Sequence, residues 1–293
     1  MKKGFYSICL CLLSFFSSQA LQDPTDLEHY AKFKIYLDSL NKISDTMILG
    51  RGPQNRIKAS YAYLGLLENA LNEFPDFAYP FDSLRNISVM GDENTKFRLF
   101  TWELLFAPGK YRHLGIIHYH NKNKEPIVKV LNDFSDNIKS PQDTINGVNQ
   151  WYGCFYYRVL RKRKKGENKY YLFGWDMNNG KSYKKVLDVL TFVEDEPVFG
   201  AADFYFEDYN TVRTRFILEY DKHASTTMNY DDNMKMIVFD HMAPVGKSQS
   251  EKDKDILIPD GSYHAFKWKR GKWIFIEKLF HFKLKDGEAP IGR

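Results

Sequence analysis

Lys169–Asp176 reads Lys-Tyr-Tyr-Leu-Phe-Gly-Trp-Asp, and it closely echoes the earlier stretch Lys96–Glu103, which reads Lys-Phe-Arg-Leu-Phe-Thr-Trp-Glu. Both begin with lysine, continue through aromatic and aliphatic residues, and end in tryptophan followed by a carboxylate. Residues of these types are typical of strands on a pleated, half-buried surface. Two later stretches end in a similar way, at residues 220–221 and 239–240. We therefore expect these stretches to be the inner strands of an antiparallel sheet.

The earlier of the two stretches carries apolar side chains on both of its faces. Alternation along a strand places Phe97 and Leu99 on one face, with Phe100 and Trp102 on the other. A strand of this kind is expected in the centre of a sheet that is covered on both sides.

Two helical runs precede the strands, within residues 24–74. Asp23-Pro24 has the pattern of an N-cap followed by proline at the first helical position. Residues 50–53 interrupt the first run, and a second apolar face follows from Ile57 to Leu71. Neither run is polar enough to stand alone, so the expected αα-hairpin should lie on the sheet.

The predicted fold is mainly β (α+β): a large antiparallel sheet, sandwich-like or partly closed, with an N-terminal αα-hairpin packed on it. Asn178-Asn179-Gly180 is the clearest turn signal between two of its strands. The spacing of the two echoing stretches leaves a propeller as an alternative, which the imperfect later echoes disfavour. The expected organisation is a signal peptide at 1–20, the helical hairpin at 21–80, an antiparallel β domain at 81–285 and a flexible tail at 286–293.

The first twenty residues have the pattern of a cleaved export signal. Lys2-Lys3 precedes an apolar run at 5–16 that is too short to span a membrane, and Ser18-Gln19-Ala20 offers a cleavage site. We expect a mature chain that begins near Leu21, has no transmembrane span after cleavage, and is periplasmic or extracellular. The only cysteine left is Cys154, which we expect to be buried and inert.

The charge and composition of the chain limit the classes of partner that it is expected to bind. Lysine and arginine number 42 against 37 acids, and removing Lys2 and Lys3 leaves 40 against 37. This near balance, together with export, argues against nucleic acid as a partner. Aromatic residues make up 16% of the chain, which indicates either an aromatic β core or an exposed platform for sugars or peptides.

One set of residues has the pattern of a metal site. His118 and His120 share one strand face, Glu125 follows, and Pro259-Asp260-Gly261-Ser262-Tyr263-His264 comes near the end. Together these resemble the two metal motifs of the cupin family, His-x-His with a glutamate and then Pro-x-Gly-x-x-His. The resemblance implies His118, His120, Glu125 and His264 as ligands. Two strand histidines beside a turn are the alternative.

The carboxylates at the expected strand ends are Glu103, Asp176, Asp221 and Asp240. If the strands share an orientation and level, these acids gather at one rim. A close pair could then hydrolyse a glycosidic bond, and several could hold calcium. In an antiparallel meander, however, neighbouring strands end at opposite rims, and each acid would instead begin a turn.

Several segments resemble a family of uncharacterised exported bacterial proteins. They are Phe97–Trp102, Gly174–Asp176, Phe239–His241 and Pro259–Tyr263. The resemblance covers most of the expected mature chain and implies an envelope or secreted location. It supplies no activity and no functional residues.

The sequence therefore favours a non-enzymatic binding or assembly module that contacts an envelope protein or a glycan and needs no cofactor. Trp102, Trp175 and Tyr263 are the candidate binding residues. The alternative is a hydrolase that uses the strand-end carboxylates, or a divalent metal held by the histidines.

Overall fold

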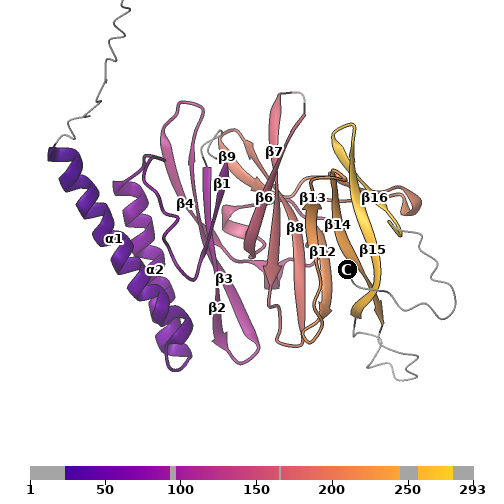
Figure 1. Cartoon of the computed structure of the whole chain (residues 1–293), viewed down its shortest axis with the longest axis horizontal. Coiled ribbons are helices and arrows are strands. Elements are labelled where there is room, and N and C mark those ends of the chain that lie inside the picture. Colours follow the sequence, from indigo (N-terminus) through magenta and orange to yellow (C-terminus); the bar gives the residue numbers. More distant parts are fainter. Residues whose placement is uncertain (1–23, 93–96, 165, 245–256, 280–293) are drawn as a thin grey trace, which may run out of the picture.

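The structure is a computed structural model that describes residues 24–92, 97–164, 166–244 and 257–279. The signal peptide expected at 1–20 and the tail expected at 286–293 lie outside these residues. The described chain forms four stacked layers, a helical hairpin and then three β-sheets, and only β12 departs from the order of the chain (Figure 1). The prediction of a mainly β fold with an N-terminal helical hairpin packed on antiparallel strands is confirmed, and the strands divide into three stacked sheets.

The helical layer contains α1 (Pro24–Leu49) and α2 (Pro53–Glu73), which confirms the predicted hairpin. The buried positions of α1 include Phe33, Leu40 and Met47, which recur every seven residues. Leu27 and Ile35, with 51% and 65% of their surface exposed, lie outside this buried face. Neither of the described helices is both long enough and apolar enough to cross a membrane.

The first sheet lies against the helices. Its strands are, in spatial order, β1 (Ser88–Asp92), β2 (Phe97–Ala107), β3 (Lys110–His120) and β4 (Pro126–Asn132). Phe100 and Trp102 of β2 pack in the core beneath the helices, while Phe97 and Leu99 pack in a second core on the opposite face. The prediction of a central strand covered on both sides is confirmed.

The second sheet packs against the face of the first sheet that is opposite the helices. Its strands are, in spatial order, β5 (Asn146–Gly147), β9 (Glu196–Phe199), β8 (Ser182–Val193), β7 (Glu167–Asp176) and β6 (Phe155–Lys164), and β12 (Phe216–Asp221) also pairs with β8. The predicted turn joins β7 to β8, with positive φ angles of 50° at Asn178 and 73° at Gly180. Positive φ is accessible to asparagine and glycine, which explains this sequence at the turn.

Cys154 is buried beside β7, which confirms its predicted burial. A Cβ atom at Gly174 would lie 2.2 Å from the Sγ atom of Cys154, so the strand needs glycine at this position. Burial raises the pKa of the Cys154 thiol well above its usual value. A thiol held protonated is a weak nucleophile.

The third sheet closes the stack on its far side. Its strands are, in spatial order, β11 (Thr211–Arg213), β10 (Phe204–Phe206), β16 (Lys272–Ile276), β15 (Leu257–Lys269), β14 (Met236–Pro244) and β13 (Met228–Asp231). All these pairs are antiparallel except β10 with β16. Phe204, Phe239 and Phe266 pack in the core that it shares with the second sheet. The high aromatic content therefore fills the spaces between layers.

Candidate functional site

The two echoing stretches become β2 and β7, which face each other across the first and second sheets. Leu99 of β2 and Leu172 of β7 belong to the core between these sheets. Side chains of alternate residues share a face, so Glu103 and Asp176 project into the same interface, beyond its apolar part. Two of the predicted strand-end acids therefore come together, although Glu103 lies within β2 and not at its end.

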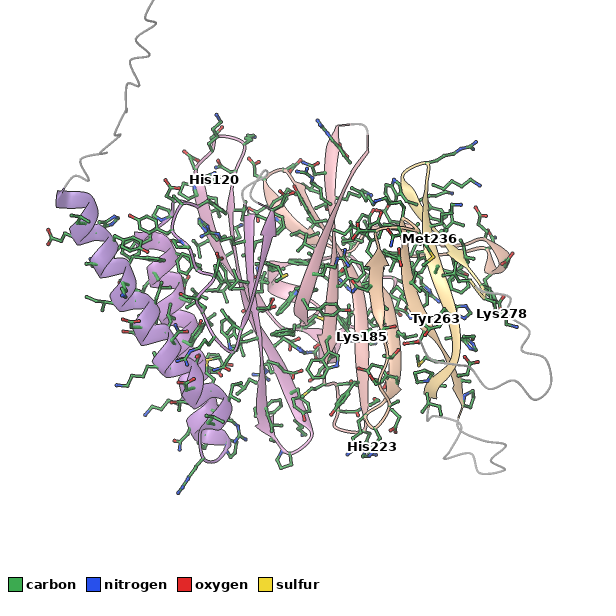
Figure 2. The ribbon with its side chains drawn as sticks, viewed as in Figure 1. His120, Lys185, His223, Met236, Tyr263 and Lys278 are labelled. Atoms are coloured by element: carbon green, nitrogen blue, oxygen red, sulfur yellow. The ribbon has the colours of Figure 1, made fainter. Side chains whose placement is uncertain are left out.

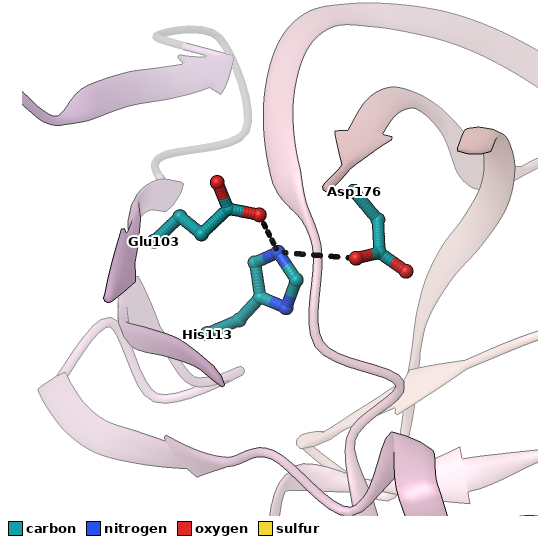
Figure 3. Close-up of side chains that lie close together, drawn as sticks. All are labelled: Glu103, His113 and Asp176. Atoms are coloured by element: carbon teal, nitrogen blue, oxygen red, sulfur yellow. Dashed lines mark hydrogen bonds and ion pairs between the residues drawn. The ribbon is translucent and has the colours of Figure 1, made fainter. Parts of the chain in front are cut away.

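His113 of β3 lies between these two carboxylates (Figure 3). Its Nε2 atom is 3.1 Å from Oε1 of Glu103 and 3.9 Å from Oδ1 of Asp176. A β-bulge between Leu105 and Ala107 shifts the β2–β3 register and sets Glu103 directly opposite His113. The three groups offer ligand atoms that all lie within 4.8 Å of one another.

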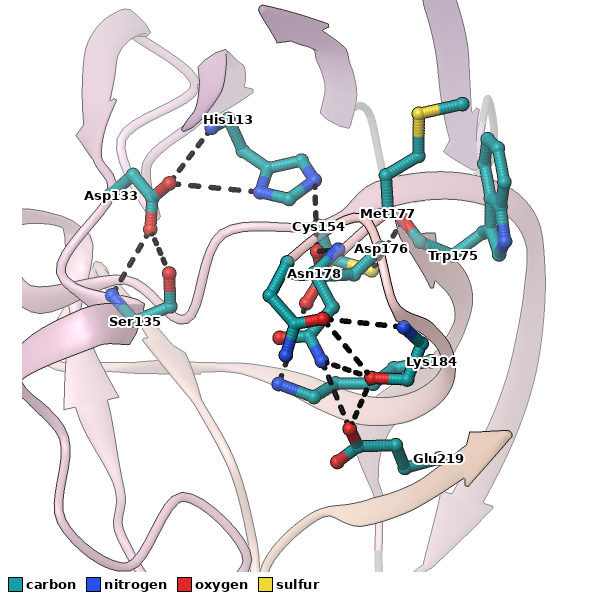
Figure 4. Close-up of polar contacts among 12 residues, drawn as sticks. His113, Asp133, Ser135, Cys154, Trp175, Asp176, Met177, Asn178, Lys184 and Glu219 are labelled. Carbon is teal, nitrogen blue, oxygen red and sulfur yellow. Dashed lines mark hydrogen bonds and ion pairs between the residues drawn. The ribbon is translucent and has the colours of Figure 1, made fainter. Parts of the chain in front are cut away.

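A third carboxylate, that of Asp133, holds His113 from its other side (Figure 4). Its Oδ2 atom accepts a hydrogen bond from the backbone N–H of His113 at 2.8 Å and lies 3.6 Å from Nδ1 of the ring. Its Oδ1 atom accepts from the backbone N–H and hydroxyl of Ser135, at 3.0 and 2.5 Å. We call Glu103, His113, Asp133 and Asp176 the His113 cluster.

The His113 cluster shifts the protonation of its members. Burial alone would lower the pKa of His113, but hydrogen bonds to Asp133 and Glu103 and the charge of Asp176 raise it to about 10. The His113 imidazolium outweighs burial at Asp133 and lowers the pKa of that carboxyl. Burial raises the pKa of Asp176, and the charges of His113 and Lys184 offset only part of this. The cluster thus places one imidazolium among three carboxyl groups.

A pocket of about 230 Å³ opens beside the His113 cluster. It is lined by Tyr111, His113, Ser135, Asp136, Ile138, Pro141, Tyr152, Asp176, Asn178 and Lys184. Tyr152 is only 2% exposed, and its hydroxyl has no hydrogen-bond partner within the described parts of the chain. Burial raises the pKa of Tyr152 well above its usual value, so the hydroxyl is neutral. The pocket therefore contains a buried hydroxyl whose hydrogen-bonding capacity is not used within the described chain.

A fully buried ion pair supports one wall of this pocket. Nε of Arg215 lies 2.9 Å from Oδ2 of Asp188, and both side chains are 0% exposed. The Arg215 guanidinium lies 4.9 Å from the centre of the Tyr152 ring, and its Nη1 donates to the carbonyl of Pro141 at 2.7 Å. Oδ2 of Asp188 also accepts from the hydroxyl of Tyr156 at 3.2 Å. We call Arg215, Asp188 and Tyr156 the Arg215 cluster; it fixes two of the pocket residues.

Asp221 and Asp240, the other two predicted acids, accept hydrogen bonds from residues near them. Oδ1 of Asp221 accepts the backbone N–H of His223 at 2.8 Å, which is the turn contact proposed as the alternative. Oδ2 of Asp240 accepts from the hydroxyl of Thr226 at 2.9 Å and from the backbone N–H of Thr227 at 2.5 Å. Neither carboxylate joins the His113 cluster.

The four predicted metal ligands are not brought together. His118 and His120 do share a strand face, and both rings contact Phe77, with centroid distances of 4.4 and 4.9 Å. Glu125 lies exposed in the turn between β3 and β4. His264 belongs to the third sheet, so the second sheet separates it from the other three. Figure 2 shows this separation through His120 and Tyr263, which lie towards opposite ends of the molecule.

The three predicted binding aromatics do not form a platform either. Trp102, a candidate binding residue, is 0% exposed and packs against Tyr63 of α2, so it is not accessible to a ligand at the surface. Trp175 is half-buried, and its Nε1 donates to the hydroxyl of Tyr220 at 3.1 Å. Tyr263 is 37% exposed in the third sheet. Each of the three belongs to a different sheet.

Comparison with protein-family models, with curated proteins and with solved structures finds no match for this chain. The site must be interpreted from its own geometry. Sequence reasoning identified Glu103 and Asp176 but missed His113, Asp133 and Tyr152. A turn at residues 107–110 does predict that β2 and β3 pair, and this is the signal that could have placed His113 near Glu103.

Proposed function

We propose that this chain is an exported, non-enzymatic binding module that holds one sugar residue of an envelope glycan in the pocket beside Asp176. The volume of about 230 Å³ suits a single sugar ring better than an extended chain or a large cofactor. The wall combines the rings of Tyr111 and Tyr152 with amide, hydroxyl, carboxyl and ammonium groups. Ligand pockets of this kind use apolar faces for contact and a few polar groups for orientation.

The balance of charges in the pocket favours a neutral ligand rich in hydroxyl groups. Asp176 and Asp136 bring carboxyl groups, while Lys184 and His113 bring cationic ones. The Lys184 ammonium lies 3.9 Å from Oδ2 of Asp176, so the two signs partly cancel within the wall. A sugar hydroxyl can both donate to a carboxylate and accept from an ammonium, which an ion of either sign cannot do.

The observation that carries the proposal is the unpartnered hydroxyl of Tyr152. Buried polar groups in proteins are nearly always hydrogen-bonded. Leaving one unsatisfied costs about 1–3 kcal/mol. Because this hydroxyl lines the pocket, a ligand hydroxyl that bonded to it would recover part of that cost on binding.

The test compares Tyr152→Phe with Tyr63→Phe. The hydroxyl of Tyr63 is also buried and lacks a partner in the described chain, but it lies in the core beneath the helices. The purified protein is titrated with a panel of mono- and oligosaccharides by calorimetry. For a saccharide that binds, Tyr152→Phe should weaken binding about tenfold, equivalent to about 1.4 kcal/mol, and Tyr63→Phe should leave it unchanged. No binding across the panel, or equal effects of the two variants, contradicts the proposal.

Export is a separate part of the proposal, supported by the N-terminal stretch that ends in Ser18-Gln19-Ala20. Its test is N-terminal sequencing of the chain recovered from a native or bacterial host after cell fractionation. We expect a first residue near Leu21 and a periplasmic or extracellular fraction. An intact Met1 in the cytoplasmic fraction contradicts it.

A second candidate, a glycoside hydrolase, is favoured by the approach of Glu103 to Asp176. Their carboxylate oxygens lie within 4.8 Å of one another, close to the separation of about 5–5.5 Å between carboxyl groups in retaining glycosidases. The raised pKa of Asp176 suits a general acid. Release of reducing ends from a panel saccharide, lost in Asp176→Asn, would establish the hydrolase; binding without turnover favours the binding module.

A further inference from the structure

We propose that Glu103, His113 and Asp176 form a binding site for one divalent cation, of the kind represented by Mn²⁺ and Zn²⁺. This inference concerns the His113 cluster itself and does not depend on sugar binding in the neighbouring pocket. It differs from the cation sites expected from the sequence, because His113 was absent from both of them.

The three donor atoms lie close to the separations that a metal ion requires, all within 4.8 Å of one another. Donors about 2.1 Å from a common ion lie roughly 3–4 Å from one another. Nε2 of His113 lies 3.1 Å from Oε1 of Glu103 and 3.9 Å from Oδ1 of Asp176. Figure 3 shows both carboxylates directed at the same ring nitrogen. The three donors come from three strands in two sheets, so an ion here would link the sheets.

The charge of the His113 cluster also suits a dication. Binding of an ion to Nε2 would release the imidazolium proton to solvent, and Glu103, Asp133 and Asp176 would then contribute three negative charges around a neutral ring. The Lys184 ammonium, 3.9 Å from Asp176, offsets one of them. A divalent cation would offset the remaining two.

Asp133 places a carboxylate beside the second ring nitrogen of His113, as is usual for histidines that bind a metal. Its carboxylate lies 3.6 Å from Nδ1 of His113 and accepts the backbone N–H of the same residue (Figure 4). A carboxylate on the far ring nitrogen orients the imidazole and makes the near nitrogen a better ligand. Ser135 in turn holds the carboxylate through two hydrogen bonds.

The buried Tyr152 hydroxyl is an independent indication of a ligand at this place. It lines the same pocket as His113 and Asp176, and it has no partner within the described chain. A water molecule or ligand on the ion could hydrogen-bond to it. The pocket also gives a route by which an ion can reach the His113 cluster from solvent.

The type of ion follows from the donors. Carboxylate oxygens suit Mg²⁺, Ca²⁺ and Mn²⁺, while an imidazole nitrogen suits Zn²⁺, Fe²⁺ and Cu²⁺. Mn²⁺ accepts both kinds of donor, and Zn²⁺ binds mixed histidine and carboxylate sets. The mixed set therefore favours these two ions over Mg²⁺.

The experiment titrates chelator-treated protein, free of any histidine tag, with Mn²⁺, Zn²⁺ and Mg²⁺. Calorimetry, and electron paramagnetic resonance for Mn²⁺, should report one saturable site per chain, with Mg²⁺ weaker by at least tenfold. At a hundredfold excess over the dissociation constant, the Tm should rise by about 5 °C. Glu103→Gln and Asp176→Asn should each weaken binding at least tenfold. The matched control Asp221→Asn changes an acid that only caps a turn, and it should change nothing.

A measurement on the unaltered protein covers the case in which a variant fails to fold. Bound Mn²⁺ broadens NMR signals near it, so the His113 ring signals should disappear at one equivalent while those of exposed His223 persist. Absence of saturable binding, binding that is unchanged in both variants, or broadening centred elsewhere overturns the inference. Glu103 does not line the pocket, so Glu103→Gln separates the two proposals: it should lose the ion and keep the direct pocket contacts to a sugar.

Discussion

Two buried charged clusters stand side by side at one pocket, and they are built differently. In the Arg215 cluster, one guanidinium meets one carboxylate and both side chains are fully buried. The His113 cluster gathers three carboxyl groups around one ring, and the Lys184 side chain that reaches it is 20% exposed. The first is balanced and closed, whereas the second is rich in acids and bordered by a pocket.

This difference separates two uses of buried charge. A balanced pair that is shielded from water has its charges already matched within the fold. An acid-rich group beside a pocket can gain interactions when a cation or a polar ligand arrives. The Arg215 cluster therefore positions the wall, through Tyr152 and Pro141, and the His113 cluster brings ionisable groups to the pocket.

The largest expected effect tests the structural role of the Arg215 cluster. Arg215→Met leaves the Asp188 carboxylate buried without its partner, which should lower the free energy of unfolding by about 3–5 kcal/mol. The control, Arg213→Met, breaks a pair with Asp143 whose side chains are 35% and 46% exposed, and it should cost about 0–1 kcal/mol. Urea unfolding measures both. A cost below about 1 kcal/mol for Arg215→Met would mean that losing the buried pair destabilises the protein no more than losing the exposed pair.

A somewhat smaller effect concerns a buried group that is uncharged at neutral pH. Burial, together with the charges of Arg98 and His120, lowers the pKa of His118 to about 4. The unfolded chain takes up this proton near pH 6.5, and the folded chain takes it up only near pH 4. The free energy of unfolding therefore has its full value, as far as His118 is concerned, above about pH 6.5. It falls by about 3 kcal/mol as the pH is lowered towards 4, because the folded chain resists protonation of this ring.

His118→Phe removes the titrating group and keeps a ring against Phe77. We expect the free energy of unfolding, measured by urea at intervals between pH 7 and 4, to decline less steeply in this variant than in the unaltered protein. His223→Ala changes an exposed histidine and should leave the decline unaltered. An equally steep decline in His118→Phe would assign acid sensitivity to other groups, including the two clusters.

The smallest effect concerns the pocket in the absence of any ligand. Removing a buried hydroxyl that has no partner should stabilise the protein, so Tyr152→Phe and Tyr63→Phe should each raise the free energy of unfolding by about 1 kcal/mol. Thermal unfolding of metal-free and sugar-free protein measures this gain. A loss in Tyr152→Phe beside a gain in Tyr63→Phe would mean that solvent already satisfies the pocket hydroxyl.

Local patterns predicted the elements of the fold well. Proline and glycine marked the ends of α1 and α2, the Asn-Gly turn joined β7 to β8, and the two apolar faces of β2 required cover on both sides. The division of the strands into three sheets was missed, because it depends on pairings between distant segments that alternation does not encode. Trp102 lies on one of these covered faces, against Tyr63 of α2, so the burial of β2 already argued against its use as a binding residue.

The candidate site was predicted in part. The repeated ending of the two stretches singled out Glu103 and Asp176 among four acids, and the structure brings these two together because the equivalent strands occupy neighbouring sheets. His113 was missed because the β2–β3 register depends on a bulge. A regular hairpin continued from Ala107 opposite Lys110 would set Glu103 against Leu114 instead. Asp133 and Tyr152 belong to the segments before β6, where turn-rich sequence gives no period from which to infer direction.

The layers follow the chain from the helices to the third sheet, apart from β12, which joins the second sheet after β10 and β11 of the third. A ribosome that releases the polypeptide from its N-terminus therefore delivers each new layer onto the apolar face left by the one before. Synthesis in this direction leaves the apolar face of the newest sheet uncovered until the next sheet forms. A chain cut short after β4 would display such a surface permanently, which makes truncated forms natural clients for chaperones.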